Sequence, residues 1–198
     1  MSVTKVNSVT SPMGLAMYAA YGRGEGAVEK INRNDLMTFI GTNRANTAEG
    51  WGIQAREDWL NSVAKQVTGR KRSVEAYHVI QSWSTDELDP NNPDDVEKAH
   101  AAGVELSQRL APHAPVMVAT QHDGRSGCVH NHIVLINADL ETGKALPGNV
   151  HKLATVRYLN DQVMRDFGMQ VLNPPEMKTT REERKAIAEG VSIESDGL

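Results

Sequence analysis

The chain has 198 residues, of which 39% are hydrophobic and 23% charged, as in an ordinary soluble chain with one substantial domain. Its net charge of −4 argues mildly against a nucleic-acid partner, although residues 65–72, KQVTGRKR, form a local basic run. No apolar run is long enough to span a membrane, and the N-terminus lacks the apolar segment of a secretory signal. The single cysteine, Cys128, excludes an internal disulfide and suits a reducing compartment. We therefore expect a cytoplasmic protein without a membrane segment.

The first half of the chain predicts two helices and a strand. Residues 15–21 are good helix formers and end at a glycine-rich turn. Residues 47–67 place apolar side chains at roughly helical spacing, which predicts a second helix. Residues 76–83 are rich in β-branched and aromatic side chains and predict a strand. The tryptophans of these segments are expected in the core, and they are Trp51, Trp59 and Trp83.

The second half predicts a helix, a hairpin and another helix. Residues 94–110 follow an acidic Asn/Pro loop and carry an apolar helical face. Residues 115–121 and 131–138 read as two strands, and the glycine-containing link between them predicts an antiparallel hairpin. A further helix is expected over residues 152–167, ended by Gly168.

These elements predict the α+β class, with a central antiparallel β-sheet and flanking helices. We expect a single domain over residues 1–175. Residues 176–198 are highly charged and are expected to form a C-terminal extension, consistent with the start of a longer protein that is truncated here.

Three of the seven histidines lie in the stretch QHDGRSGCVHNHIVLI, residues 121–136. Residues i and i+2 of a strand share a face, so His130 and His132 point the same way. His122, at the end of the partner strand, can supply a third imidazole across the hairpin. Three protein nitrogens with open positions describe a catalytic metal site rather than a closed structural one. The alternative is that these histidines only fill the hairpin, hydrogen-bonded or exposed.

The sequence also carries HVIQSW upstream of this stretch, and LETGK and NDQVMRDFG downstream. With HNHIV between them, these motifs resemble the MobA-type (MOBP-like) relaxases of mobilizable and conjugative plasmids, members of the HUH endonuclease superfamily. The likeness extends over nearly the whole chain, to about Pro175. It implies a relaxase-like palm domain that nicks one DNA strand at the origin of transfer. A tyrosine would keep the 5′-phosphate and leave a free 3′-OH, and the reverse reaction would reseal the strand.

The resemblance also implies roles for residues. The two HUH histidines map to His130 and His132, and the nucleophile maps to Tyr18. Tyr21 is the rival, because it lies three residues further on nearly the same helical face. Asp123 would orient a ligand imidazole or accept the tyrosine proton. The implied cofactor is a divalent metal ion, Mn, Mg or Zn, whose identity the sequence does not determine.

Two departures from the family pattern concern the hairpin. Asn131 stands between the histidines, where the superfamily name expects an apolar residue. The family usually has His-x-Asp at the start of the hairpin, whereas this chain has Gln121-His122-Asp123. If Asp123 is the matching acid, Gln121 occupies the family's histidine position and the ligand has moved one place, to His122.

Other residues have weaker patterns. His78 could support a metal ligand or be an ordinary hydrogen-bonded sheet histidine, and Cys128 is expected to be passive. The histidines without a pattern are expected at the surface, and they are His100, His113 and His151. Contacts with DNA phosphates require cations. The candidates are Arg23, Lys71, Arg72 and Arg125.

The implied partners are single-stranded DNA of the transfer origin, an accessory DNA-binding protein and a coupling ATPase. A rolling-circle replication initiator of the HUH class shares the chemistry and is the nearest alternative. A non-catalytic, metal-stabilised DNA-binding module is the alternative from another class. A water-using metalloenzyme is disfavoured, because the chain has no HExxH motif and no second metal cluster.

Overall fold

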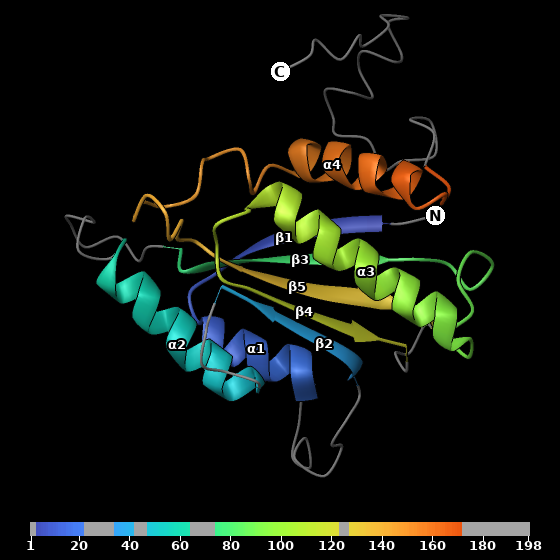
Figure 1. The fold of residues 1–198 in the computed structure, drawn as a ribbon, viewed down its shortest axis with the longest axis horizontal. Coiled ribbons are helices and arrows are strands. Elements are labelled where there is room, and N and C mark those ends of the chain that lie inside the picture. Colours follow the sequence, from blue (N-terminus) through green and yellow to red (C-terminus); the bar gives the residue numbers. More distant parts are fainter. Residues whose placement is uncertain (1–2, 22–33, 42–46, 64–73, 123–126, 172–198) are drawn as a thin grey trace, which may run out of the picture.

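The computed structural model describes residues 3–21, 34–41, 47–63, 74–122 and 127–171. It shows an α+β fold around one five-stranded sheet with the strand order β1-β3-β5-β4-β2 (Figure 1). All neighbouring strands are antiparallel, as the sequence predicts. The elements in chain order are β1 Val3–Val9, α1 Pro12–Tyr21, β2 Asn34–Ile40, α2 Ala48–Asn61, β3 Ala76–Ser82, α3 Pro93–Leu110, β4 Val116–Gln121, β5 His130–Ile136 and α4 Leu153–Asp166.

The expected hairpin forms the centre of the sheet. Strands β4 and β5 pair so that Val116 lies opposite Leu135 and Gln121 opposite His130. On its other side β5 pairs with β3, which places Ser82 opposite His130 as well. Strand β5 is therefore the middle strand, and its side chains alternate between the two faces of the sheet.

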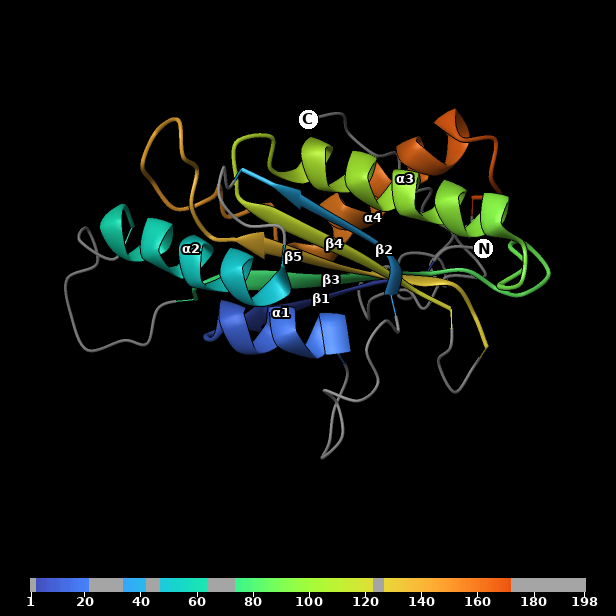
Figure 2. The same cartoon turned by 60° about the horizontal axis from the view of Figure 1, so that its bottom comes forward.

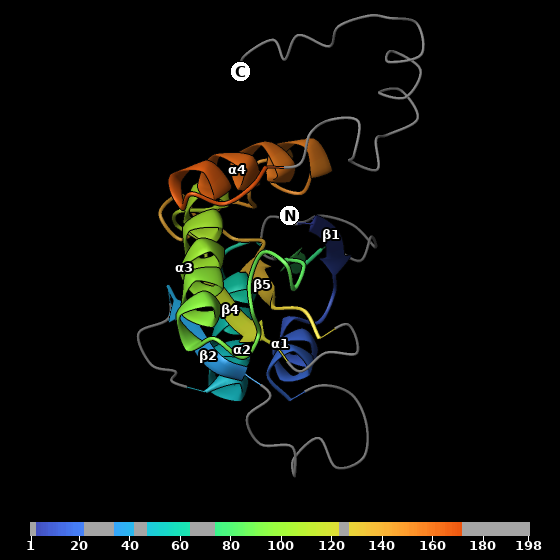
Figure 3. The same cartoon turned by 90° about the vertical axis from the view of Figure 1, so that its right-hand side faces the viewer.

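Helices cover both faces of the sheet. Figure 2 shows α3 and α4 on one face of the sheet and α1 and α2 on the other face. Figure 3 shows α3 and α4 next to each other. Two apolar clusters follow from this arrangement. One joins Val118 and Ile133 to α3 and α4, and the other joins Ala119 and Val134 to α1 and α2.

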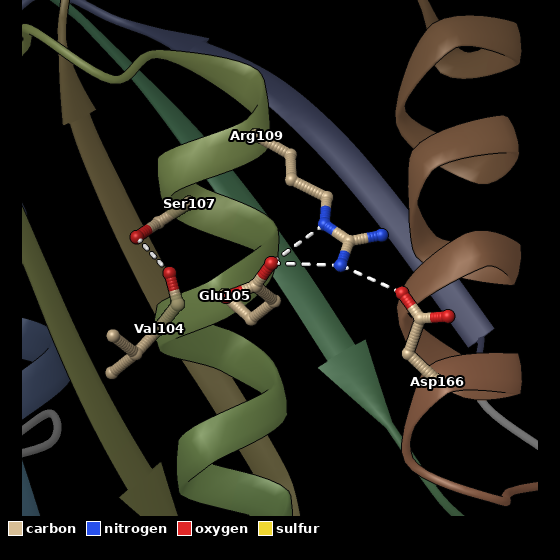
Figure 4. Close-up of polar contacts among 5 residues, drawn as sticks. All are labelled: Val104, Glu105, Ser107, Arg109 and Asp166. Carbon is tan, nitrogen blue, oxygen red and sulfur yellow. Dashed lines mark hydrogen bonds and ion pairs between the residues drawn. The ribbon is translucent and has the colours of Figure 1, made fainter.

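Helix α3 begins and packs as its sequence predicts. The side chain of Asn92 accepts a hydrogen bond from the backbone N–H of Asp94, and Pro93 occupies the first turn. Its predicted apolar face is buried, and it consists of Val96, Ala99, Gly103, Leu106 and Leu110. At the exposed side, Arg109 joins the two helices of this layer by contacting Glu105 and, at 2.7 Å, Asp166 of α4 (Figure 4).

Small residues bring α1 close to the sheet. Ala16, Ala19 and Ala20 are at most 2% exposed. Helix α2 packs closely against α1, where a Cβ at Gly52 would lie only 2.9 Å from the Cα of Met13. The indoles of Trp51 and Trp59 fill this layer, as expected, while Trp83 belongs to the opposite one. Helices α1 and α2 thus lie side by side in one layer (Figure 2), and both contact β5.

The elements differ from the prediction mainly at the sheet edges. Strands β1 and β2 were not predicted; β1 has no continuous apolar run, whereas β2, NDLMTFI, carries a largely apolar run over residues 36–40 that the prediction missed. Helix α2 ends at Asn61, earlier than the expected residue 67, and residues 64–67 lie outside the described ranges. Helix α4 and its end at Gly168, where φ is 65°, confirm the prediction. Within the described ranges no helix combines the length and hydrophobicity needed to cross a bilayer.

Candidate active site

The two HxH histidines lie on the face of the sheet that α1 covers. Their neighbours in register are Ala119 for His132 and Gln121 for His130, so these side chains share one face. The His130 and His132 ring centroids are 5.2 Å apart, with the ring planes at 72°. His132 is only 5% exposed, whereas His130 is half-buried. The expectation of two imidazoles on one face is thus met.

Helix α1 places Tyr18 against these histidines. The Tyr18 ring approaches His132 edge-on, with the centroids 5.7 Å apart. Tyr18 itself is half-buried, while the next two residues are buried and anchor this turn of the helix to the sheet. Tyr21 is the last residue of α1, and its side chain lies outside what the structure describes. The geometry therefore joins Tyr18 to the histidine pair.

His78 of β3 is a third imidazole in this cluster. Its Nε2 lies 2.8 Å from Nδ1 of His132, and the two rings are stacked with centroids 5.0 Å apart. Burial lowers the pKa of His78 to about 4. Burial also lowers the pKa of His132 to about 3, and the nearby His78 and His130 act in the same direction. Both rings are therefore neutral near pH 7, and one donates a hydrogen bond to the other. Of the two interpretations of His78, the structure favours support of His132.

Gln121 is a site residue to which the sequence assigned no role. It is 7% exposed and lies directly opposite His130. Its Nε2 donates a 2.6 Å hydrogen bond to the carbonyl oxygen of Ala19, next to Tyr18. Its Oε1 lies 3.1 Å from Nε2 of His130. One side chain thus connects the histidine strand to the tyrosine helix. The available signal was its position in the first place of the Gln-His-Asp triplet.

The donor atoms of this cluster fit a divalent cation. If Nδ1 of His130 donates to the carbonyl oxygen of Cys128, which is 3.1 Å away, its Nε2 keeps a lone pair. If His132 donates from Nδ1 to His78, its Nε2 also keeps a lone pair. Hydrogen bonding of the second ring nitrogen is the usual support of a metal-bound histidine. His130 and His132 could therefore hold a metal ion, with His78 and the Cys128 carbonyl orienting their rings.

The third ligand remains a prediction. Among the residues that the structure describes, no three His, Cys, Asp or Glu side chains converge as a metal-binding group. His122 follows the last residue of β4. Asp123 lies outside the described residues, as do the candidate cations Arg23, Lys71, Arg72 and Arg125.

Asn131 faces the other side of the sheet and lies in a buried polar network. It is 0% exposed; its Oδ1 accepts from the Thr120 hydroxyl at 2.7 Å, and its Nδ2 donates to Gln81 and to the Ala99 carbonyl. His100 continues the network by contacting Thr120 and Thr38, so the expectation that it lies at the surface is wrong. Asn131 is therefore a structural residue between two site residues.

A central strand with an HxH pair facing a helical tyrosine is the arrangement that the resemblance to HUH endonucleases predicts. The family "Relaxase: MobA/VirD2-like, nuclease domain" matches residues 41–169, and the chain belongs to this family. The resemblance seen in the sequence is confirmed. One Staphylococcus aureus "Protein rlx" is 33% identical over 123 residues, which are 61% of this chain and 36% of the relative. Another is 30% identical over 148 residues, 73% of this chain and 42% of the relative. The chain thus spans less than half the length of these curated relatives.

Solved relaxase domains share the fold. The Mn-bound MobM relaxase domain in complex with plasmid pMV158 oriT DNA aligns with a TM-score of 0.62 at 15% identity, covering 94% of this chain and 98% of that one. The metal-bound conjugative relaxase TrwC in complex with oriT DNA aligns with a TM-score of 0.56 at 11% identity, covering 100% and 87%. At these identities the likeness establishes the fold.

Proposed function

We propose that this chain is the nicking domain of a plasmid relaxase, which cleaves one DNA strand at an origin of transfer and stays bound through a phosphotyrosine. The observation that carries the proposal is the Tyr18 ring held 5.7 Å from the His132 ring, on the face that also bears His130. Membership of the relaxase family supports it. Two proteins with this fold, MobM and TrwC, were solved with oriT DNA, which supports the same substrate class.

The chemistry is a transesterification. The Tyr18 oxygen forms a bond to the scissile phosphorus, the bond to the 3′-oxygen breaks, and the departing oxygen takes up a proton. A divalent metal on His130 and His132 would bind the non-bridging oxygens and act as a Lewis acid. Helix α1 supplies position, because its buried alanines fix the distance of Tyr18 from the sheet. A phenolate is a fair leaving group, so the reverse attack by a 3′-OH can reseal the strand.

The cofactor proposed is Mn, Mg or Zn, with Mn supported by the Mn-bound MobM domain. The third protein ligand of the metal would be either Gln121 or His122, the ligand that the sequence predicts. Asp123 is proposed to orient a ligand or accept the tyrosine proton. Phosphate contacts are proposed for four cations outside the described residues: Arg23, Lys71, Arg72 and Arg125.

The wider setting follows from the family. We place the relaxase domain in residues 1–175, with residues 176–198 as a charged extension. A single cysteine and no membrane-spanning helix among the described elements are consistent with action in the cytoplasm. An accessory DNA-binding protein and a coupling ATPase are proposed partners, as in other relaxases of this type.

The test is incubation with end-labelled single-stranded origin DNA, with Mn²⁺ or Mg²⁺ and then with chelator, resolved on a denaturing gel. We expect a metal-dependent covalent adduct that Tyr18→Phe abolishes while DNA binding persists. Tyr158→Phe is the matched control, because this tyrosine is 58% exposed on α4. Loss of the adduct only in Tyr21→Phe would keep the function and correct the nucleophile. Binding of a verified origin without cleavage would indicate the non-catalytic module, and nicking restricted to a replication origin would indicate the rolling-circle initiator.

A further inference from the structure

The carboxamide of Gln121 has a fixed orientation in the site. Its Nε2 is 2.6 Å from the carbonyl oxygen of Ala19. Exchanging the amide nitrogen and oxygen would place two acceptors at that distance, so the nitrogen must be the group that faces Ala19. The oxygen is then the atom turned toward His130, 3.1 Å from its Nε2.

The His130 ring has a similar constraint. Its Nδ1 lies 3.1 Å from the Cys128 carbonyl oxygen and its Nε2 lies 3.1 Å from Gln121 Oε1, and both oxygens can only accept. A neutral ring carries one proton and donates to only one of them. With the proton on Nδ1, the lone pair of Nε2 faces the lone pairs of Gln121 Oε1, an arrangement that a cation lying against both atoms would stabilise. Their 3.1 Å separation is close to the about 3 Å expected between adjacent ligands of an octahedral ion with ligand distances near 2.1 Å.

We propose that Gln121, through its carboxamide oxygen, is the third protein ligand of the metal beside His130 and His132, and that its amide nitrogen holds the Tyr18 turn in place. Gln121 shares the face of both histidines, since it lies opposite His130 in the β4–β5 register. This inference rests on the proposed function for the identity of the site. An amide oxygen is a harder ligand than an imidazole, so the site favours Mn²⁺ or Mg²⁺ more than a three-histidine site would.

The experiment measures Mn²⁺ binding to the purified chain by electron paramagnetic resonance of the free ion, without DNA. Gln121→Met and Gln121→Glu both lose the donor to Ala19, but only Glu keeps an oxygen at the ligand position. We expect Gln121→Met to weaken Mn²⁺ binding at least tenfold and Gln121→Glu to bind at least as tightly as the unmodified chain. His122→Ala is the matched neighbour, and its affinity should stay within twofold. Thermal melting without metal shows that each variant is folded.

Three results would overturn the ligand assignment. The first is that Gln121→Met binds Mn²⁺ as tightly as the unmodified chain does. The second is that Gln121→Met and Gln121→Glu weaken binding equally, which would attribute the effect of Gln121 to its contact with Ala19 alone. The third is that His122→Ala shows the tenfold loss of affinity. The adduct assay separates this inference from the function. Mn²⁺ binding that depends on Gln121 in a protein forming no adduct would sustain the ligand and refute the relaxase activity. A normal adduct together with Mn²⁺ binding that does not depend on Gln121 would sustain the relaxase activity and refute the ligand assignment.

Discussion

Asn131→Ala is expected to destabilise the fold strongly. It removes the acceptor of the Thr120 hydroxyl and the donor to Gln81 Oε1 and to the Ala99 carbonyl, whose hydrogen bonds are 2.7, 2.9 and 2.7 Å long. A buried polar group left without its partner costs about 1–3 kcal/mol. Three polar groups lose their partner and the surroundings relax in part, so we expect the free energy of unfolding to fall by about 3–5 kcal/mol. That is a large part of the about 5–15 kcal/mol of a typical domain.

The assay for this prediction is urea unfolding of the metal-free protein, with Asn149→Ala as the control. Asn149 is exposed, so its replacement should change the free energy of unfolding by no more than about 0.5 kcal/mol. A loss below about 1 kcal/mol in Asn131→Ala would refute the view that this amide is needed for the packing of β5 against α3. Water entering the site would be the physical reason for such a result.

Two further predictions concern pH and the helix layer. In metal-free protein, His78 and His132 stay neutral when folded but bind protons below about pH 6.5 when unfolded, so stability rises with pH between about 4 and 6.5 and is lost on acidification. At pH 5 each of these two histidines lowers the free energy of unfolding by on the order of 2 kcal/mol relative to its value at pH 7. In urea unfolding, His78→Gln should therefore reduce the dependence of this free energy on pH. His113→Gln, at an exposed site, should not change it. Arg109→Met should cost only about 0.2–1 kcal/mol, because its partner Asp166 is 59% exposed, and 1 M salt should remove the difference in melting temperature.

The sequence predicts the middle of the fold better than its edges. The apolar faces of α3 and α4 and the β-branched run of β5 carry period and composition strong enough to be assigned. Strand β1, VTKVNSV, mixes polar and apolar residues, because an edge strand whose described side chains are exposed or half-buried needs no apolar run. Its place beside β3 depends on pairing with residues 67 to 79 positions away, which no local pattern encodes.

The site follows the same division. His130 and His132 could be predicted, because strand alternation alone places them on one face. The contribution of Gln121 could not, because it depends on the pairing of β4 with β5 and on the height of α1 over the sheet. His78 had a signal in the sequence, but its contact with His132 depends on the register of β3, in which Ile80 lies opposite His132.

Asn131 shows why a polar residue suits the middle of this HxH motif. A shift of β5 by one residue would turn both histidines away from Tyr18, and an apolar side chain at 131 would oppose such a shift only through burial. The amide adds directional bonds to Thr120 on β4, Gln81 on β3 and Ala99 on α3, each of which a shift would break. Gly103 makes room for it, since a Cβ there would collide with the Asn131 amide nitrogen. Polar bonds on one face of the strand thus fix the register on which the metal-facing geometry of the other face depends.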